Sequence, residues 1–425
     1  MVYAGKWGVP MILIEGPAEL GGEIRIQGAK NSTLPILAAC VICKGQTVLH
    51  NCPKLSDVET AVHILEHLGC KCEREGTDLI VENGMSCCEI PPDLMQEMRS
   101  SIVFLGALVS RCGEANLCFP GGCELGPRPI DLHISALKKL GVEIEEIGGC
   151  LHCKAPKGVE GSYVSLAFPS VGATENVMLA AVCSTGTTII ANAAREPEII
   201  DLASFLNRCG GRIYGAGESC VIIDGVRELY GCEHKIMPDR IVSATYMAAA
   251  AVTGGNVTLH GVDNTHILPM LSPFEEAGCM VRQLGGSLNI MAPRRLEAVK
   301  HIRTMPYPGF PTDAQPMVMS MAAVGKGTSI FVENIFENRY KHAEELQRLG
   351  AKIKVEGKVA IVEGVERLTG APVAARDLRG GAALVVAGLA AEGVTSVGGT
   401  EYIRRGYEDI VGNLAALGAE IREDD

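Results

Sequence analysis

The pattern of apolar and polar positions repeats along this chain. Six runs of small apolar residues have the composition of buried helices, and each ends at a glycine. A short extended segment, such as 188–190, follows each of them and has the β-branched content typical of a strand. An amphipathic helix is expected next in each case. The apolar runs are 32–45, 100–113, 173–186, 241–254, 314–327 and 381–393.

A second set of glycines ends the amphipathic helices. Glycine suits the left-handed residue that commonly follows a helix. Successive members of this set are 72, 69, 68, 72 and 68 residues apart, so one unit of about 70 residues occurs six times and predicts an α/β fold. Because each apolar helix must be surrounded on nearly all sides, we expect these helices inside and the sheets outside. The stop glycines are Gly69, Gly141, Gly210, Gly278, Gly350 and Gly418.

Polar residues directly precede each apolar helix. Ser, Thr, Asp and Asn in this position are typical helix N-caps. Cations are disfavoured there by the helix dipole, yet four of the six starts carry one: Lys30, Arg99, Arg240 and Arg379. If the six helix starts face a common region, their N–H groups and these cations form a binding site for an anionic ligand that carries phosphate and carboxylate groups.

Composition restricts the class of protein. A length of 425 residues predicts two or three domains, and 47% hydrophobic with 21% charged residues is typical of a globular protein. The net charge of −12 argues against a nucleic-acid or anionic-membrane partner. No signal peptide and no long apolar run is recognisable, so a cytoplasmic location is expected.

The 17 cysteines are irregularly spaced, and we expect reduced thiols rather than a disulfide framework. The pairs Cys40/Cys43 and Cys150/Cys153 leave a structural zinc site as the less favoured alternative. Cys123 stands apart because glycines flank it, and Arg128 follows between two prolines. A mobile thiol beside a rigidly presented guanidinium suits a loop that closes over an anionic substrate, although a surface loop with an incidental cysteine is the alternative.

Eight motifs occur in order along the chain: GAKNS at 28–32, GGCELGPRP at 121–129, PSVGAT at 169–174, NAAREPEI at 192–199, FPTD at 310–313, FENRY at 336–340, DLR at 377–379 and RGYE at 405–408. From about residue 12 to the C-terminus, the chain resembles the UDP-N-acetylglucosamine 1-carboxyvinyltransferase family of enolpyruvyl transferases in these motifs. The resemblance implies an inside-out α/β barrel fold with two domains of three repeated units each. One domain would comprise 30–237 and the other 1–29 plus 238–425, with the active site in the cleft between them.

The reaction that the resemblance implies is transfer of the enolpyruvyl group of phosphoenolpyruvate to the 3'-hydroxyl of UDP-N-acetylglucosamine, with release of phosphate. This step opens peptidoglycan synthesis. Cys123 would be the proton donor, the site of a covalent adduct and the target of fosfomycin, while Asp313 would be the base near the 3'-hydroxyl. Lys30 and Arg405 would also act in catalysis. The implied phosphoenolpyruvate-binding residues are Lys30, Asn31, Arg128, Arg339, Arg379 and Arg405.

The resemblance also implies a set of UDP-sugar contacts, while Glu196 and Asp239 match acidic residues near the cleft whose roles stay open. No metal or cofactor is expected. Phe168 departs from the family where some members have lysine, and Gly380-Gly381 replaces less flexible residues. The UDP-sugar contacts would be Asn31, Arg99, Arg128, Pro129, Ile130, Asp131, Leu132, Phe168, Pro169, Ser170, Val171, Gly172, Asp313 and Ile335.

Three other functions are alternatives. A shikimate 3-phosphate enolpyruvyl transferase is the nearest, but Cys123 and the 192–199 motif favour the UDP-sugar enzyme. RNA 3'-phosphate cyclase shares related units and is disfavoured by the acidic charge balance. A non-catalytic regulatory paralogue would be expected to lack Cys123, Asp313 or Arg405, and all three are present.

Overall fold

The structure is a computed structural model that describes residues 10–121 and 130–424. Contacts between Cα atoms divide this part of the chain into two compact units. We call the described residues from 28 to 237 the first unit, and residues 10–27 with 238–424 the second unit. Each unit has its own hydrophobic core.

Helices of the first unit form a buried set and an amphipathic set. In α1 and α6 nearly every residue is buried, and α4 packs against α6. Helix α4 is preceded by a 3₁₀ helix, η1 (Arg99–Val103). The α-helices are α1 (Lys30–Cys40), α2 (Ser56–His67), α3 (Pro92–Glu97), α4 (Phe104–Cys112), α5 (Asp131–Lys139), α6 (Val171–Ala181) and α7 (Pro197–Arg208).

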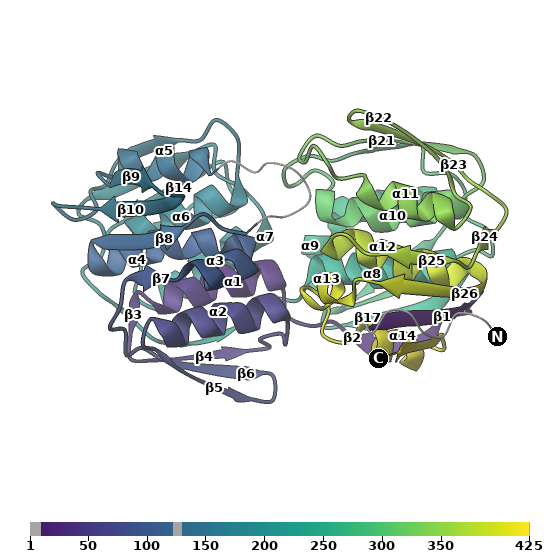
Figure 1. The fold of residues 1–425 in the computed structure, drawn as a ribbon, viewed down its shortest axis with the longest axis horizontal. Coiled ribbons are helices and arrows are strands. Elements are labelled where there is room, and N and C mark those ends of the chain that lie inside the picture. Colours follow the sequence, from purple (N-terminus) through teal and green to yellow (C-terminus); the bar gives the residue numbers. More distant parts are fainter. Residues whose placement is uncertain (1–9, 122–129, 425) are drawn as a thin grey trace. The chain divides into compact units, whose positions relative to one another are not determined.

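The first unit has three four-stranded sheets, with strand orders β16-β4-β6-β5, β7-β8-β10-β9 and β11-β12-β14-β13, and the short strands β15 and β3 form a separate pair. In Figure 1 the strands β4, β5 and β6 lie along the outer side of α2. The strands are β3 (Cys43–Lys44), β4 (Gln46–His50), β5 (Lys71–Glu75), β6 (Asp78–Glu82), β7 (Glu89–Ile90), β8 (Glu114–Cys118), β9 (Glu143–Ile147), β10 (Cys150–Lys154), β11 (Tyr163–Ser165), β12 (Thr187–Ala191), β13 (Ile213–Tyr214), β14 (Cys220–Asp224), β15 (Leu229–Tyr230) and β16 (Glu233–Lys235).

The second unit is built from the same kinds of element. Helices α8, α10 and α12 are almost entirely buried and pack against one another. A 3₁₀ helix, η2 (Thr312–Ala314), precedes α10. The α-helices are α8 (Arg240–Val252), α9 (Asn264–Glu276), α10 (Gln315–Val324), α11 (Lys341–Arg348), α12 (Leu378–Ala390), α13 (Thr400–Arg404) and α14 (Ile410–Ala416).

The sheets of the second unit have the orders β18-β19-β17-β2, β20-β21-β23-β22 and β24-β26-β1-β27, and β25 also pairs with β26. The N-terminal strand β1 therefore lies beside the C-terminal strand β27 (Figure 1). The strands are β1 (Met11–Gly16), β2 (Gly21–Arg25), β17 (Asn256–His260), β18 (Met280–Leu284), β19 (Ser287–Met291), β20 (His301–Arg303), β21 (Thr328–Val332), β22 (Lys352–Glu356), β23 (Val359–Glu363), β24 (Leu368–Thr369), β25 (Pro372–Ala374), β26 (Ala391–Gly398) and β27 (Glu420–Asp424).

The predicted stop glycines are confirmed. All six have positive φ, between 83° at Gly141 and 105° at Gly210, which is the left-handed conformation that L side chains disfavour. The glycines that end the six apolar runs also have positive φ. The helices end before these glycines, however: α1 ends at Cys40 rather than at residue 45, α4 ends one residue before Gly113, and Gly393 lies in β26. The predicted helix ends were therefore too late, because these glycines follow the helices and are not their last residues.

Helix capping follows the prediction at three of the six apolar helices. Side chains of Ser170, Asp239 and Asp377 accept hydrogen bonds from backbone N–H groups of α6, α8 and α12. At α1, η1 and η2 the N-cap residue makes no such bond. In the part of the chain that is described, no helix combines the length and the apolar character needed to cross a membrane.

Candidate functional site

The second unit holds Asp313 between two buried guanidinium groups. Arg339 Nη2 lies 3.4 Å from Asp313 Oδ1, and Arg379 Nε lies 3.4 Å from Asp313 Oδ2. The Asp313 side chain is 27% exposed, whereas those of Arg339 and Arg379 are 1% and 2% exposed. The two arginines therefore fix both oxygens of a carboxylate that solvent can still reach.

Local structure explains how these three residues meet. Asp313 lies in η2, at the start of α10, and Arg379 is the second residue of α12, which packs against α10. Arg339 lies just before α11, and its Nη2 also donates to the carbonyl oxygen of Thr312 at 3.0 Å. Asp377 caps α12 and lies 3.8 Å from Arg339 Nη1. Arg379, a cation predicted at the start of a buried helix, thus has a carboxylate partner in this unit.

Tyr407 contacts a different nitrogen atom of Arg379 from the one beside Asp313. Arg379 Nη1 donates to Tyr407 Oη at 3.2 Å, and its guanidinium carbon lies 5.5 Å from the centre of the Tyr407 ring. Burial alone lowers the pKa of Arg379, but Tyr407, Asp313 and Asp239 raise it above its ordinary value. The guanidinium therefore stays charged although it is buried.

Several buried polar atoms of this region have no hydrogen-bond partner within the described residues. They are both side-chain polar atoms of Gln315, Nε of Arg339 and Nε2 of His342. Burial lowers the pKa of His342 to about 4, so its imidazole is neutral at physiological pH. Unpartnered buried polar groups are costly, and a bound ligand or water is the usual compensation.

The first unit places Lys30 next to a carboxylate at the start of α1. Lys30 Nζ lies 2.6 Å from Asp57 Oδ2, and the two side chains are 10% and 3% exposed. Ser32, expected as a cap, instead donates to Asp201 Oδ2, while His234 Nε2 lies 3.0 Å from Asp201 Oδ1. The polar start of α1 is thus held by side chains of α2 and α7.

A second polar group of the first unit surrounds His133 on α5. Its Nδ1 lies 2.7 Å from Nδ2 of Asn176, and the Asn176 side chain also bonds backbone groups of Gly106 and Ile102. Burial lowers the pKa of His133 to about 4, with a further contribution from Arg99. A Cβ at Gly172 would lie 3.0 Å from His133 Cε1, so glycine allows this close approach.

Acidic side chains gather near the start of α7. Burial, with smaller contributions from Glu198 and Glu196, raises the pKa of Glu175 to about 8. Glu196, whose role the sequence left open, is the N-cap residue of α7, and its Oε2 accepts from the Arg195 backbone N–H at 3.0 Å. Glu175 is therefore largely protonated at neutral pH.

The remaining predicted site residues are placed as follows. Phe168 is exposed before α6, next to the half-buried residues from Pro169 to Gly172. Glu333 holds Ile335 through a backbone N–H bond of 2.7 Å and accepts from Thr312 Oγ1 at 3.0 Å. Cys123, Arg128 and Pro129 lie outside the described residues. Four of these residues are half-buried: Asn31, Arg99, Leu132 and Arg405. Asp131 is exposed, whereas Ile130 and Asp239 are buried.

Sequence reasoning missed Asp57 and Tyr407 as members of these clusters. Asp57 lies in the first turn of α2, where an acidic residue is ordinary, so its sequence position gave no signal. Tyr407 lies inside the 405–408 motif, so the motif contained the signal, but only its arginine was given a role. Both residues are identified by contacts with residues distant in sequence.

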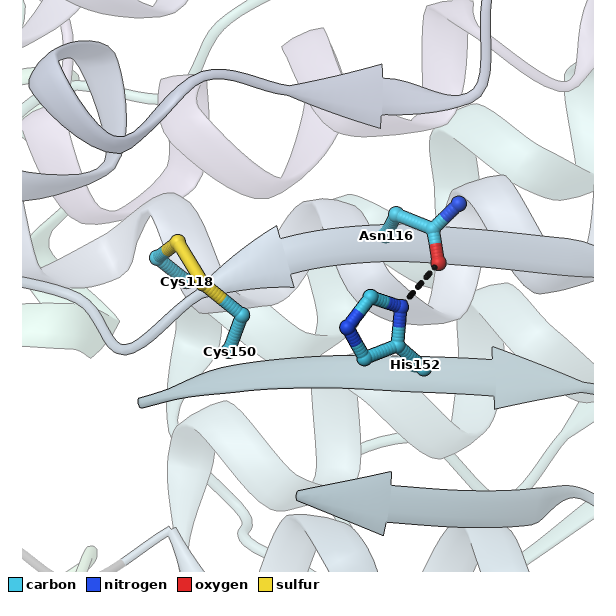
Figure 2. Close-up of a disulfide and its surroundings, with 4 residues drawn as sticks. All are labelled: Asn116, Cys118, Cys150 and His152. Atoms are coloured by element: carbon cyan, nitrogen blue, oxygen red, sulfur yellow. Dashed lines mark hydrogen bonds between the residues drawn. A yellow bond between two sulfur atoms is a disulfide. The ribbon is translucent and has the colours of Figure 1, made fainter. Parts of the chain in front are cut away.

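The expectation that all cysteines are reduced thiols is wrong at one pair. Cys118 on β8 and Cys150 on β10 form a disulfide (Figure 2). The antiparallel register places these residues directly opposite each other, which a separation of 32 residues does not reveal. Two residues away, Asn116 and His152 also face each other, with Oδ1 and Nδ1 2.9 Å apart (Figure 2).

The other cysteines that the structure describes are free. Cys40 Sγ donates to the carbonyl oxygen of Ile36. Because Cys150 is in the disulfide, the Cys150/Cys153 pair does not offer two thiols to a zinc ion. Among residues 10–121 and 130–424, no group of three or more His, Cys, Asp or Glu side chains is arranged to hold a metal ion.

Comparison with known proteins decides the family. The profile of the EPSP synthase (3-phosphoshikimate 1-carboxyvinyltransferase) family matches residues 14–414. A relative from Caldanaerobacter subterraneus subsp. tengcongensis, named UDP-N-acetylglucosamine 1-carboxyvinyltransferase 2, is 51% identical over 409 residues, which cover 96% of this chain and 98% of the relative. The chain belongs to the UDP-N-acetylglucosamine 1-carboxyvinyltransferases. The predicted family and enzyme class are confirmed.

A second relative supports the same family. This relative, from Symbiobacterium thermophilum and also named UDP-N-acetylglucosamine 1-carboxyvinyltransferase, is 48% identical, with 96% of this chain and 94% of the relative covered. The enolpyruvyl transferase NikO from Streptomyces tendae is 24% identical and superposes with a TM-score of 0.89 over 98% of this chain and 99% of that chain. EPSP synthase from Acinetobacter baumannii is 17% identical with a TM-score of 0.75, covering 98% and 100%. These two structures show a shared enolpyruvyl transferase fold.

Proposed function

We propose that this protein transfers the enolpyruvyl group of phosphoenolpyruvate to the 3'-hydroxyl of UDP-N-acetylglucosamine and releases phosphate. The observation that carries the proposal is the 51% identity, over nearly the full length of both chains, to a relative named for this activity. Both substrates are anions, which gives a reason for buried cations at helix starts in both units. The reaction would provide the first committed intermediate of peptidoglycan synthesis.

Asp313 is the proposed base. As the 3'-oxygen attacks C2 of phosphoenolpyruvate, Asp313 takes the hydroxyl proton, and Cys123 supplies a proton to the methylene carbon C3. The tetrahedral intermediate then loses a proton from C3 and expels phosphate, which restores the carbon–carbon double bond. Arg339 and Arg379 support this role because each contacts a different oxygen of Asp313 and so fixes the direction of its lone pairs.

The cations Lys30, Arg128, Arg379 and Arg405 bind the carboxylate and phosphate of phosphoenolpyruvate in this proposal. Lys30 is favoured because its ammonium is buried and held by Asp57. Arg339 is a further proposed phosphoenolpyruvate-binding cation, and it also holds Asp313, because its Nη2 lies 3.4 Å from Asp313 Oδ1. The stretches 130–132 and 168–172, with Asn31, Arg99 and Ile335, remain the proposed UDP-sugar contacts.

The predicted arrangement of three repeated segments in each of two domains stays a proposal, and so does the predicted inside-out barrel. Their support is the pairing pattern of the sheets: five of the six main sheets contain one parallel and two antiparallel pairs of strands, as in β11-β12-β14-β13. The sixth has a second parallel pair, because both β24 and β25 pair with β26. The two predicted domain boundaries lie close to the limits of the two units. A cytoplasmic location and small-molecule substrates without nucleic acid are also proposed.

The product identifies the reaction. After incubation with phosphoenolpyruvate and UDP-N-acetylglucosamine, proton NMR of the purified UDP-sugar should show two vinyl protons, and the sugar should carry the added carboxyvinyl group by mass. A parallel incubation with shikimate 3-phosphate should leave that acceptor unchanged. Carboxyvinylation of shikimate 3-phosphate alone would assign the chain to the alternative acceptor, and two unchanged acceptors with folded protein would support the regulatory alternative.

A further inference from the structure

Tyr407 lies between α13 and α14 and is 2% exposed. Its hydroxyl has two protein neighbours, Thr245 Oγ1 on α8 at 2.7 Å and Arg379 Nη1 on α12 at 3.2 Å. Its ring also lies beside the Arg379 guanidinium, 5.5 Å from the ring centre to the guanidinium carbon. One side chain thus joins two buried helices of the second unit.

Counting protons fixes the direction of these hydrogen bonds. Arg379 has only donors, so Tyr407 Oη must accept from it. Thr245 Oγ1 donates its single proton to the carbonyl oxygen of Ile241 at 2.9 Å, and it therefore accepts from Tyr407. Tyr407 therefore donates to Thr245, and Thr245 donates to the carbonyl oxygen of Ile241. Because the Tyr407 proton points to Thr245, a lone pair of Tyr407 Oη faces Arg379.

This direction is important because the Arg379 guanidinium is buried. Its Nε lies 3.4 Å from Asp313, and its Nη1 points to Tyr407. Without the phenol oxygen, a buried donor would lose its partner and the planar guanidinium could turn away from Asp313. Two contacts on different nitrogen atoms fix the plane of the group.

We infer that Tyr407, itself held by Thr245, is a positioning residue that fixes the Arg379 guanidinium for phosphoenolpyruvate. Tyr407 need not touch the substrate. The inference rests on the proposed function, in which Arg379 binds phosphoenolpyruvate, and adds to it the residue that orients this cation.

Proton donation by Tyr407 to the substrate is disfavoured by the same geometry. Its proton is engaged with Thr245, and burial raises the pKa of Tyr407 above its ordinary value. The phenol therefore keeps its proton at neutral pH and acts through the orientation of its lone pairs.

Steady-state kinetics of Tyr407→Phe test the inference, because this change removes the hydroxyl and keeps the ring. The Michaelis constant for phosphoenolpyruvate should rise about tenfold, a loss of about 1.4 kcal/mol of binding, while that for UDP-N-acetylglucosamine stays within about twofold. Thr245→Val should give a smaller rise of the same kind. Because both act through one contact, the double variant should bind no more weakly than Tyr407→Phe.

Tyr246→Phe is the matched control. Tyr246 follows Thr245 on α8 and is buried, but its hydroxyl accepts from Asn413 Nδ2 at 2.9 Å rather than from Arg379. This variant should leave both Michaelis constants unchanged. Equal effects of Tyr407→Phe and Tyr246→Phe would overturn the inference in favour of a general packing role, and so would unchanged constants in a folded Tyr407→Phe protein.

A measurement without turnover separates this inference from the proposed function. The Nε–H proton of Arg379, whose NMR signal is assigned by its loss in Arg379→Lys, should exchange with water faster in Tyr407→Phe than in the wild type or in Tyr246→Phe. A wild type that is inactive with both acceptors would refute the proposed function, and the exchange rate would still decide whether Tyr407 orients Arg379. Equal exchange rates in the wild type and Tyr407→Phe would contradict the inference.

Discussion

Lys30 and Asp57 form a buried ion pair, with 2.6 Å between Nζ and Oδ2. The pair joins the first residue of α1 to the first turn of α2. It resolves the unfavourable placement of a cation at a helix start, because the carboxylate offsets the positive end of the helix dipole. Removing one partner of a buried ion pair leaves the other charge buried and uncompensated, which destabilises the folded protein.

Asp57→Asn should therefore lower the free energy of unfolding by about 3 kcal/mol at neutral pH. Urea unfolding monitored by circular dichroism measures this change. Glu66→Gln, an exposed site on the same helix, is the control and should stay within about 0.5 kcal/mol of the wild type. Equal stability of the two variants would show that the Lys30–Asp57 pair contributes little.

Arg339→Lys tests the fixed orientation of Asp313. A lysine ammonium cannot reproduce the planar group that reaches Asp313, Thr312 and Asp377 at once. We expect kcat to fall by about 100-fold, because a small misplacement of a catalytic group has an effect of that size. Arg348→Lys, an exposed position on α11, should retain full activity. A nearly normal kcat for Arg339→Lys would show that Arg339 does not orient Asp313 for catalysis.

The sequence predicted the stop glycines and the buried helices well, for a physical reason. Stop glycines and apolar helices are local features, since positive φ and uniform burial select particular residues at each position. Gly69 and Gly350, for example, were assigned correctly from the sequence alone, and their φ angles are 100° and 93°. Helix ends were placed less well, because α1 ends five residues before Gly45.

Contacts between distant residues could not be predicted. Asp57 looks like an ordinary first-turn acid, and Ser32 looks like a cap until the fold brings Asp201 to its hydroxyl. Cys118 and Cys150 became partners only through the register of β8 and β10. In each case the partner is set by packing, which local sequence patterns do not encode.

Glu175 should make stability depend on pH. Its folded pKa is about 8, above the ordinary value of 4.5, because burial and then Glu198 and Glu196 disfavour its charge. Its contribution is therefore fully present below about pH 4.5 and is lost as pH rises to about 8, at about 1.4 kcal/mol per pH unit.

Glu175→Gln should remove this part of the pH dependence. The free energy of unfolding of the wild type, minus that of Glu175→Gln, should fall as pH rises from 5 to 8. The histidines are the same in both proteins, so their titration largely cancels in this difference. Glu143→Gln, at an exposed position, should give a flat difference. A flat difference for Glu175→Gln as well would mean that Glu175 is ionised in the folded protein.

The disulfide between Cys118 and Cys150 should stabilise the first unit. A bridge across 32 residues restricts the unfolded chain by about 3–4 kcal/mol. Unfolding of the Cys118→Ser/Cys150→Ser protein without reductant should show a loss of that order, and reductant should have no further effect on this variant. Cys220→Ser, at an exposed free cysteine, is the control. Alkylation of both Cys118 and Cys150 in the untreated wild type would show that the bridge is absent.

We propose that the anion-binding residues of this chain serve enolpyruvyl transfer to a UDP-sugar. Phosphate release from phosphoenolpyruvate, measured with UDP-N-acetylglucosamine and separately with shikimate 3-phosphate, distinguishes the two acceptors. We expect release only with the UDP-sugar, and severe loss of that release in both Cys123→Ala and Asp313→Asn. Release with shikimate 3-phosphate instead, or undiminished release in the Asp313→Asn protein, would contradict it.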